Sequence, residues 1–288
     1  MTRTAPLPDR DIHADSPVGI IGVGSIGAAA ALRLEACGLD VVVFDPDPGR
    51  VEWAHNNSVE IRSSCEDLWR AAGKVVLIVV RTAEQVEAVL QCAPSDCSGR
   101  VAVVLSTIGP SSIESVASLC AERQLELVDA PLSGGVSSTE SGELAIMVAA
   151  SDRGFEMAAE VLGSLGRCIH VGNEPGAGQA VKVANQMVMA ASVVASIEAL
   201  GIAEQYGVRR EVFQDVLAHS TGRCWAIDNL ERVVDMWELG PSGPLELLRK
   251  DLNLVTSQTA AGRDDRTIAG ELLDRLFKPT TTPTEERQ

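Results

Sequence analysis

The stretch that decides the fold is "IIGVGSIGAAAALRL", residues 20–34. Its glycines follow the pattern G-x-G-x-x-G, directly after a short apolar run and at the start of an alanine-rich helical pattern. Such a turn brings the backbone close to a pyrophosphate, and the amides at the helix start hold the phosphates. The alternative is a tight packing turn without a ligand. The cofactor-binding residues predicted at this turn are Gly22, Gly24, Ser25, Ile26 and Gly27.

An acidic residue follows the second apolar run at the distance that a dinucleotide site requires. Asp45 ends the stretch "DVVVFD" and lies 18 residues after Gly27. A carboxylate there hydrogen-bonds the adenosine ribose 2'-hydroxyl and repels a 2'-phosphate, which favours NAD over NADP. Arg50, in "DPDPGR", keeps NADP as the alternative because it could pair with that phosphate.

The order of apolar runs predicts two domains. Runs such as "VVLIVV", "VAVVL" and "LELVDA" alternate with amphipathic stretches, which indicates an α/β domain with a doubly wound, mostly parallel sheet covered on both faces. From residue 178 to 206 the chain is free of proline and dense in Ala, Val and Met, which predicts one long helix before an all-α domain. The predicted divisions are 1–16 and 279–288 as flexible tails, 17–175 as the sheet domain and 176–278 as the helical domain.

The composition excludes several classes of function. The 288 residues carry a formal net charge of -16, which argues against nucleic acid as a main partner. No apolar run approaches the roughly 20 residues that cross a membrane, and the polar N-terminus lacks a signal peptide's apolar centre. The seven cysteines form no C-x-x-C pair, so neither a disulfide framework nor a metal site is predicted. We therefore expect a soluble, cytoplasmic protein with no membrane partner.

Two further stretches follow strands and should face a ligand beyond the carboxyl ends of the sheet. They are "VVRT", with Val80 and Arg81, and "LSTIGPSS", with Ser106 and Thr107. The alternative for the second stretch is that Ser106 and Thr107 only cap the helix after Pro110.

The stretch "VDAPLSGG" ends a further predicted strand with proline and continues with Ser133, Gly134 and Gly135. Two glycines expose backbone amides that no side chain shields, and the serine adds a hydroxyl. This combination predicts a small anion cradle, with an ordinary turn as the alternative.

Lys182 is the only charged residue between Gln179 and Ser196 in the long apolar helix. Asn185 and Gln186 lie three and four residues further on, hence on the same face. Burial disfavours a charged amine and lowers the pKa of a lysine toward neutrality, where the lysine can both accept and donate a proton. The alternative is a lysine that reaches solvent from the helix edge. Lys250, in "LLRKDLNL", is by its pattern alone typical of a solvated helix face.

These pieces, in this order, resemble the β-hydroxyacid dehydrogenase family, which includes 3-hydroxyisobutyrate, tartronate semialdehyde and L-threonate enzymes. The resemblance covers about residues 17–277. It rests on "GVGSIG" at 22–27, "DAPLSGGVSSTESGEL" at 129–144, "GAGQAVK" at 176–182 and Lys250-Asp251. It implies a Rossmann domain joined by a long helix to an all-helical domain, and a homodimer or homotetramer.

The resemblance also implies residue roles. Lys182 would be the catalytic general acid or base, and Ser133, Gly134 and Gly135 would hold the carboxylate of a small hydroxy acid. Asn185 or Gln186 would bind substrate. The nicotinamide side would comprise Val80, Arg81 and Thr107, and Lys250 would close the site over cofactor and substrate.

The chain departs from the family pattern at three places. Asn185 and Gln186 stand where relatives often have one asparagine, four residues after the lysine. Arg81 occupies a turn that commonly carries proline, and its charge could recruit a second anionic group. The segment after "KDL" is shorter than usual. The expected activity is NAD-dependent interconversion of a 3-hydroxy acid and its aldehyde or keto acid. The alternatives are an imine reductase and a non-catalytic dinucleotide-binding module.

Overall fold

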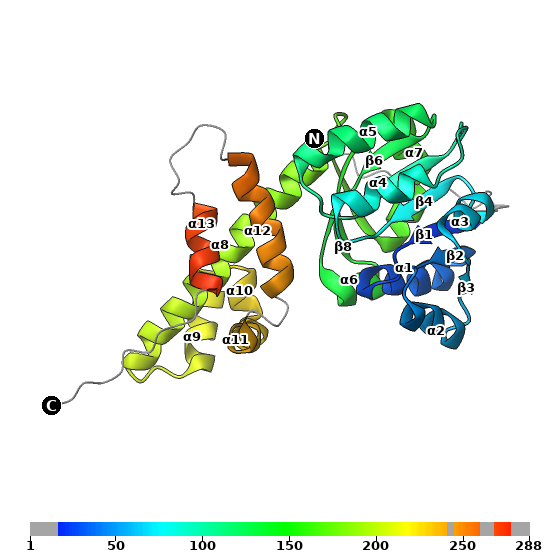
Figure 1. The fold of residues 1–288 in the computed structure, drawn as a ribbon. Coiled ribbons are helices and arrows are strands. Elements are labelled where there is room, and N and C mark those ends of the chain that lie inside the picture. The colour runs from blue at the N-terminus through cyan, green and yellow to red at the C-terminus, as the bar shows by residue number, and fades with distance from the viewer. Residues whose placement is uncertain (1–16, 241–244, 260–267, 278–288) are drawn as a thin grey trace. The chain divides into compact units, whose positions relative to one another are not determined.

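The computed structural model describes residues 17–240, 245–259 and 268–277, which fall into two compact units (Figure 1). The first unit ends at Lys182 and the second begins at Val183, so the division lies inside the longest helix. The sequence pattern placed the domain boundary at residue 176. The helix start belongs with the first unit because Gln179 is hydrogen-bonded to it. The predicted tails, 1–16 and 279–288, lie outside the described residues.

The first unit is built on a nine-stranded sheet in the order β3-β2-β1-β4-β5-β6-β8-β7, with β9 paired to β8. Strands β1 to β6 pair with one another in parallel, whereas β6 and β7 both pair antiparallel with β8. The doubly wound, mostly parallel sheet predicted from the sequence is therefore confirmed. The strands are β1 (Val18–Ile21), β2 (Val41–Phe44), β3 (Glu60–Ile61), β4 (Val75–Ile78), β5 (Val101–Val104), β6 (Glu126–Asp129), β7 (Leu132–Ser133), β8 (Leu144–Ala150) and β9 (Gly166–Gly172).

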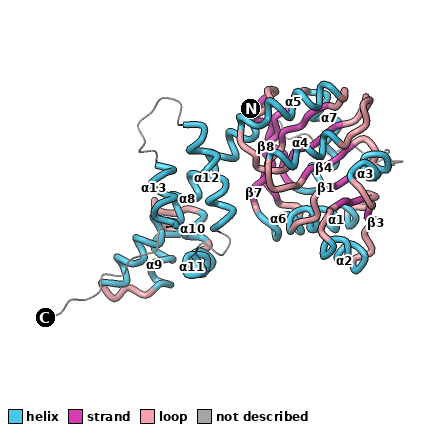
Figure 2. Tube along the Cα trace, viewed as in Figure 1, coloured by secondary structure: helices cyan, strands magenta, loops and turns pink. Residues whose placement is uncertain are grey.

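Helices cover both faces of this sheet (Figure 2) because the strand side chains alternate between two cores. Ile20 and Leu77 point into the core beneath α1 and α7, whereas Ile21 and Ile78 point into the core beneath α3, α4 and α5. The helices of this unit are α1 (Ser25–Ala36), α2 (Pro48–Asn56), α3 (Cys65–Ala71), α4 (Ala83–Gln91), the 3-10 turn η1 (Pro110–Ser112), α5 (Ile113–Glu122), α6 (Gly135–Ser141) and α7 (Asp152–Leu165).

All the regular secondary structure described in the second unit is helical, as the sequence pattern predicts. Its core gathers buried residues such as Val193, Val233 and Leu252. The stretch "AIDNLERVVDMW", which reads as one helical pattern, forms two helices because the backbone leaves helical geometry at Asn229 (φ -122°, ψ 35°). The helices are α8 (Ala177–Gln205), which begins in the first unit, and α9 (Arg210–Ala218), α10 (Trp225–Asp228), α11 (Leu230–Leu239), α12 (Leu245–Thr259) and α13 (Ile268–Phe277).

Helix α8 is long and apolar enough to cross a membrane by length and composition, contrary to the expectation that no stretch would qualify. Packing in the helical unit accounts for part of that composition. Val183, Ala190, Val193 and Val194 on one of its faces are buried in the core of the helical unit, and the same helix carries the buried Lys182. The core helix of a soluble protein passes the same test.

Candidate active site

The glycine turn between β1 and α1 is packed too closely for a side chain at two of its three motif glycines. Gly22 has φ +97°, and a Cβ there would overlap the carbonyl oxygen of Val79. A Cβ on Gly27 would overlap the carbonyl oxygen of Gly22. These two glycines are therefore required by the close packing of helix, turn and neighbouring strand.

Gly24 differs from its two neighbours in the motif. It is the N-cap of α1 in extended geometry (φ -67°), and a Cβ built on it would have no heavy atom within 4 Å. The fold thus does not require glycine here, but an approaching pyrophosphate does. The first amides of any helix have no intrahelical acceptor. In α1 no side chain caps them and the first turn holds no acidic residue, so the amides that follow Gly24 are suited to bind phosphate. The turn fits a dinucleotide.

Asp45 lies beside this turn at the end of β2. Its Oδ2 accepts a hydrogen bond from Val23 N at 2.7 Å, and its Oδ1 accepts one from Asp47 N at 2.9 Å. The carboxylate therefore joins the glycine turn to the loop after β2. The structure brings the two halves of the predicted cofactor signature together through one side chain.

The ends of β4 and β5 are joined by Ser106. Its Oγ accepts a hydrogen bond from Val80 N at 2.9 Å and donates to the carbonyl of Ile78 at 3.3 Å. The alternative capping role is not observed, because neither η1 nor α5 has a side-chain cap hydrogen bond. Gln85 Oε1 also accepts from Arg81 N at 2.9 Å. The two turns predicted to face the cofactor are thus held by side chains.

Asp129, at the end of β6, is fully buried and holds the start of α8. Its Oδ2 accepts from the amides of Gly176 (3.0 Å) and Gln179 (3.2 Å), and its Oδ1 accepts from Gln179 Nε2 (2.9 Å). Burial raises the pKa of the Asp129 carboxyl, and the hydrogen bonds from Gln179 and the backbone oppose that rise. An anion at a helix N-terminus is also favoured by the helix dipole.

The glycines of "GAGQAVK" allow α8 to approach the sheet this closely. Gly176 has φ +97°. A Cβ on Gly178 would lie 2.8 Å from the carbonyl oxygens of Asp129 and Met147. Lys182 follows one helical turn after Gly178 and is buried, with 6% of its surface exposed. The alternative interpretation, in which Lys182 reaches solvent from the helix edge, therefore does not hold in this structure.

The turn after β7 has the open backbone that the anion cradle requires. Gly134 and Gly135 have φ +137° and +74°, values that side chains rarely permit. A Cβ on Gly135 would meet no atom within 4 Å, whereas one on Gly134 would lie 2.5 Å from Ser138 Cβ. Ser133 is half-buried and pairs with Ala145 of β8.

The remaining predicted residues belong to the second unit. Gln186 is buried and its Nε2 donates to Asp251 Oδ2 at 2.8 Å, while its Oε1 accepts from Asn185 Nδ2 at 3.3 Å. Lys250 Nζ lies 3.6 Å from Asp251 Oδ1. Asp251 thus gathers Gln186 and Lys250, so Lys250 is not simply one charge on a solvated face.

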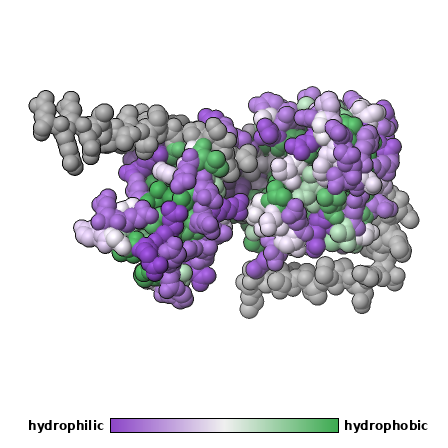
Figure 3. All heavy atoms as spheres, turned by 90° about the horizontal axis from the view of Figure 1, so that it is seen from below, coloured by the Kyte–Doolittle hydropathy of each residue, from purple (hydrophilic) through white to green (hydrophobic). Residues whose placement is uncertain are grey.

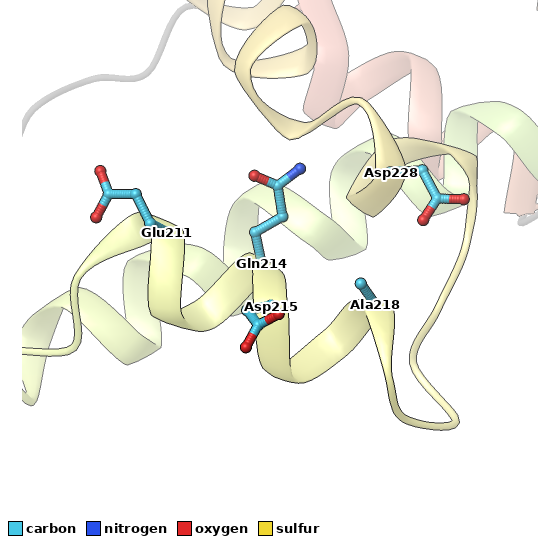
Figure 4. Close-up of a pocket in the computed structure, with 5 residues that line it drawn as sticks. All are labelled: Glu211, Gln214, Asp215, Ala218 and Asp228. Carbon is cyan, nitrogen blue, oxygen red and sulfur yellow. The ribbon is translucent and has the colours of Figure 1, made fainter.

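A shallow pocket in the helical unit is lined by Glu211, Gln214, Asp215, Ala218 and Asp228 (Figure 4). Three of its five residues are acidic, and Asp228 already accepts hydrogen bonds from Arg223 Nε. Negative charge repels a hydroxy acid. This pocket is therefore unsuited to the substrate.

The sequence patterns missed two residues of the site. Asp129 and Gln179 each lie within a quoted motif, but neither is among the predicted site residues, and in the structure they are hydrogen-bonded to each other in the site's buried polar centre. The available signal was polarity: each is a polar residue in an otherwise apolar stretch.

Two family descriptions match the chain. The NAD-binding domain of 6-phosphogluconate dehydrogenase matches residues 17–172. The NAD-binding domain of NADP-dependent 3-hydroxyisobutyrate dehydrogenase matches residues 176–281. Together they span both units.

Named relatives agree. The L-threonate dehydrogenase of Pectobacterium atrosepticum is 30% identical, over 84% of this chain and 81% of that protein. The 2-(hydroxymethyl)glutarate dehydrogenase of Eubacterium barkeri is 31% identical, over 83% of this chain and 80% of that protein. The structure of Mycobacterium tuberculosis 3-hydroxyisobutyrate dehydrogenase with L-serine superposes on this chain with a TM-score of 0.76. The match has 28% sequence identity and covers 90% of this chain and 91% of that one. The chain therefore belongs to the β-hydroxyacid dehydrogenase family, whose members are NAD(P)-dependent enzymes that act on a CH–OH group.

Proposed function

We propose that this protein interconverts a small 3-hydroxy acid and its aldehyde or keto acid, with NAD as the cofactor. The observation that carries the proposal is the buried Lys182, on a helix whose start is fixed to the end of β6 by Asp129. The strand that ends at Asp129 leads, four residues later, to Ser133. One short segment thus connects the proposed acid-binding turn to the anchor of the proposed proton-transfer residue.

The cofactor supplies a hydride acceptor when bound. Its pyrophosphate would lie at the amides that follow Gly24, and its adenosine ribose at Asp45. The turns of Val80, Arg81 and Thr107 would flank the nicotinamide, and Lys250 would close over the site. The support for this placement is the space at Gly24 and the fixed geometry of the flanking turns.

The substrate carboxylate would be bound by the backbone amides of Gly134 and Gly135 and by the Ser133 hydroxyl. In the oxidative direction, Lys182 Nζ takes the hydroxyl proton while the hydride leaves the carbinol carbon, and it returns the proton in the reductive direction. Asn185 or Gln186 would contact substrate; Gln186 Nε2 donates to Asp251 Oδ2, and Asn185 Nδ2 donates to Gln186 Oε1.

The test is NADH formation with a panel of 3-hydroxyisobutyrate, glycerate, threonate, serine and sulfonated analogues. We expect turnover with at least one carboxylate-bearing 3-hydroxy acid. NAD binding without turnover of any hydroxy acid, or reduction of cyclic imines instead, would reject the proposal. Lys182 and the "DAPLSGG" stretch favour the dehydrogenase over an imine reductase or a non-catalytic module, since those relatives generally lack the lysine.

Replacing Asp45 with asparagine should shift the cofactor preference. Asparagine retains an oxygen that can accept from Val23 N, as Asp45 does at 2.7 Å, but loses the charge that repels a 2'-phosphate. A hydrogen bond to a charged group contributes about 1.5–3 kcal/mol, so we expect the ratio of kcat/KM for NADP to that for NAD to rise about tenfold or more. The measurement is steady-state kinetics with both cofactors.

The control is Asp47→Asn, which removes a neighbouring carboxylate at the N-cap of α2, where asparagine caps equally well. Its cofactor ratio should remain that of the wild type. An unchanged ratio in Asp45→Asn would show that Asp45 does not select the cofactor.

We further propose a cytoplasmic homodimer or homotetramer. All seven cysteines are free thiols, which suits a reducing compartment. Helix α8 and the residues after it expose large apolar side chains, among them Val188 (66%), Ile202 (61%) and Tyr206 (84%), and apolar surface is visible on the helical unit in Figure 3. Exposed apolar surface of this kind is typical of subunit contacts.

A further inference from the structure

Gln179 is fully buried, and every polar atom of its side-chain amide is hydrogen-bonded. Its Oε1 accepts from the amides of Ile108 (2.9 Å) and Gly109 (3.1 Å). Its Nε2 donates to the carbonyl of Ser106 (3.1 Å) and to Asp129 Oδ1 (2.9 Å). One side chain therefore joins three segments: the loop after β5, the end of β6 and the first turn of α8.

The amide of Gln179 has one workable orientation. Two donors face its oxygen and two acceptors face its nitrogen, so a flipped amide would place donors against donors. Asp129 strengthens this choice because its two carboxyl oxygens accept hydrogen bonds from three N–H groups, so it faces the amide as an acceptor. The side chain is thus a rigid connector.

Lys182 follows Gln179 by three residues, about 4.5 Å along the helix axis and on a neighbouring position of the same face. Gln179, Lys182 and Gln186 are all buried, with 0%, 6% and 8% of their surfaces exposed, in the first part of a mostly apolar helix. The loop that Gln179 holds contains Thr107, on the side proposed for the nicotinamide. The connector therefore links the proposed proton-transfer residue to the proposed hydride-transfer side.

Resting on the proposed function, we propose that Gln179 is a positioning residue of the reaction. It sets the register of Lys182 relative to the loop of residues 106–109, and Asp129 fixes the orientation of its amide. A displacement of about 1 Å at a reacting group can lower the rate about 100-fold. Loss of the connector should therefore slow the chemical step more than it weakens cofactor binding.

The first test is Gln179→Met, which keeps the length of the side chain and removes its hydrogen bonds. With the full chain, far below its melting temperature, we expect kcat to fall about 10- to 100-fold. The Kd for NADH, measured by fluorescence, should change less than threefold. The control is Trp69→Phe, which also removes a buried hydrogen bond, from Trp69 Nε1 to the carbonyl of Val89 (3.0 Å), between α3 and α4. It should lower the melting temperature and leave kcat unchanged.

The second test is Gln179→Glu, which covers the case in which the methionine variant does not fold. The introduced carboxyl retains an acceptor for Ile108 and Gly109, and when protonated its single O–H can donate to Asp129 Oδ1, one of the two acceptors that the amide serves. When ionised it faces Asp129, and two adjacent carboxylates resist ionising together. Relative to the wild type, its kcat should be nearly normal at low pH and fall as pH rises. Trp69→Phe should show no such change in the pH profile.

The outcomes separate this inference from the proposed function. If Lys182→Ala retains turnover, the proposed function fails, whatever Gln179 does. The positioning role is overturned if Lys182→Ala is inactive but both Gln179 variants behave as the wild type. That means that Gln179→Met keeps the wild-type kcat and Gln179→Glu keeps the wild-type pH profile, each normalised to the molecules that bind NADH. Gln179 would then be only a structural residue.

Discussion

Replacing Lys182 with alanine is expected to lower kcat by about 10²- to 10⁴-fold, the range in which a positioned general acid or base contributes. The lysine is buried on α8, next along the face from the anchored Gln179. No other lysine or histidine lies between residues 171 and 218. Cofactor binding should persist, because the residues around Gly24 lie at the start of α1 and not on α8. The measurements are steady-state turnover with the best hydroxy acid and NADH binding by fluorescence.

The matched control is Lys74→Ala, which removes an exposed lysine from the loop between α3 and β4 in the same unit. It should leave kcat and NADH affinity as they are in the wild type. Turnover by Lys182→Ala within a few-fold of the wild type would contradict the assigned role. Loss of both turnover and NADH binding would instead indicate an effect on the fold.

The sheet domain was predictable because its determinants are local. Apolar runs of four residues, such as Val75–Ile78, are buried on both faces, and the helices between them carry their own caps, as Thr82 and Gln85 do for α4. The antiparallel pairing of β8 with β6 and β7 was not predicted. It depends on contacts between distant segments, such as Val128 with Ala150, that periodicity does not encode.

The site was predictable where a motif imposes a backbone geometry. The glycine turn and Asp45 meet as the spacing indicates, because Gly22 and Gly27 are required by packing and Asp45 holds Val23. The contact of Asp129 with Gln179 spans 50 residues, and no local pattern specifies it. The contact of Gln186 with Asp251 spans 65 residues and is likewise specified by no local pattern.

Two alanine substitutions in the glycine turn are expected to have opposite consequences. In Gly27→Ala, the new Cβ would overlap the carbonyl oxygen of Gly22, and the backbone must move. Overpacking of a well-packed site costs about 1–3 kcal/mol, and more where backbone is the obstacle, so we expect a large fall in melting temperature or no folded protein. In Gly24→Ala, the Cβ meets no atom and the extended backbone tolerates alanine. Its melting temperature should stay within a few degrees of the wild type.

Gly24→Ala should nevertheless bind NADH about 10- to 100-fold more weakly, because its methyl group occupies the space that we assign to the pyrophosphate. Calorimetry of the apo variant and NADH titration separate the two effects. The control is Gly163→Ala, where the Cβ also meets no atom but the position is inside α7 and exposed; alanine there should stabilise the helix and leave NADH affinity unchanged. A Gly24→Ala variant with normal NADH affinity would show that the open space at this turn does not hold the cofactor. A selective loss of affinity in a fully folded variant would tie the glycine to the ligand rather than to the fold, since packing already explains Gly22 and Gly27 but does not explain Gly24.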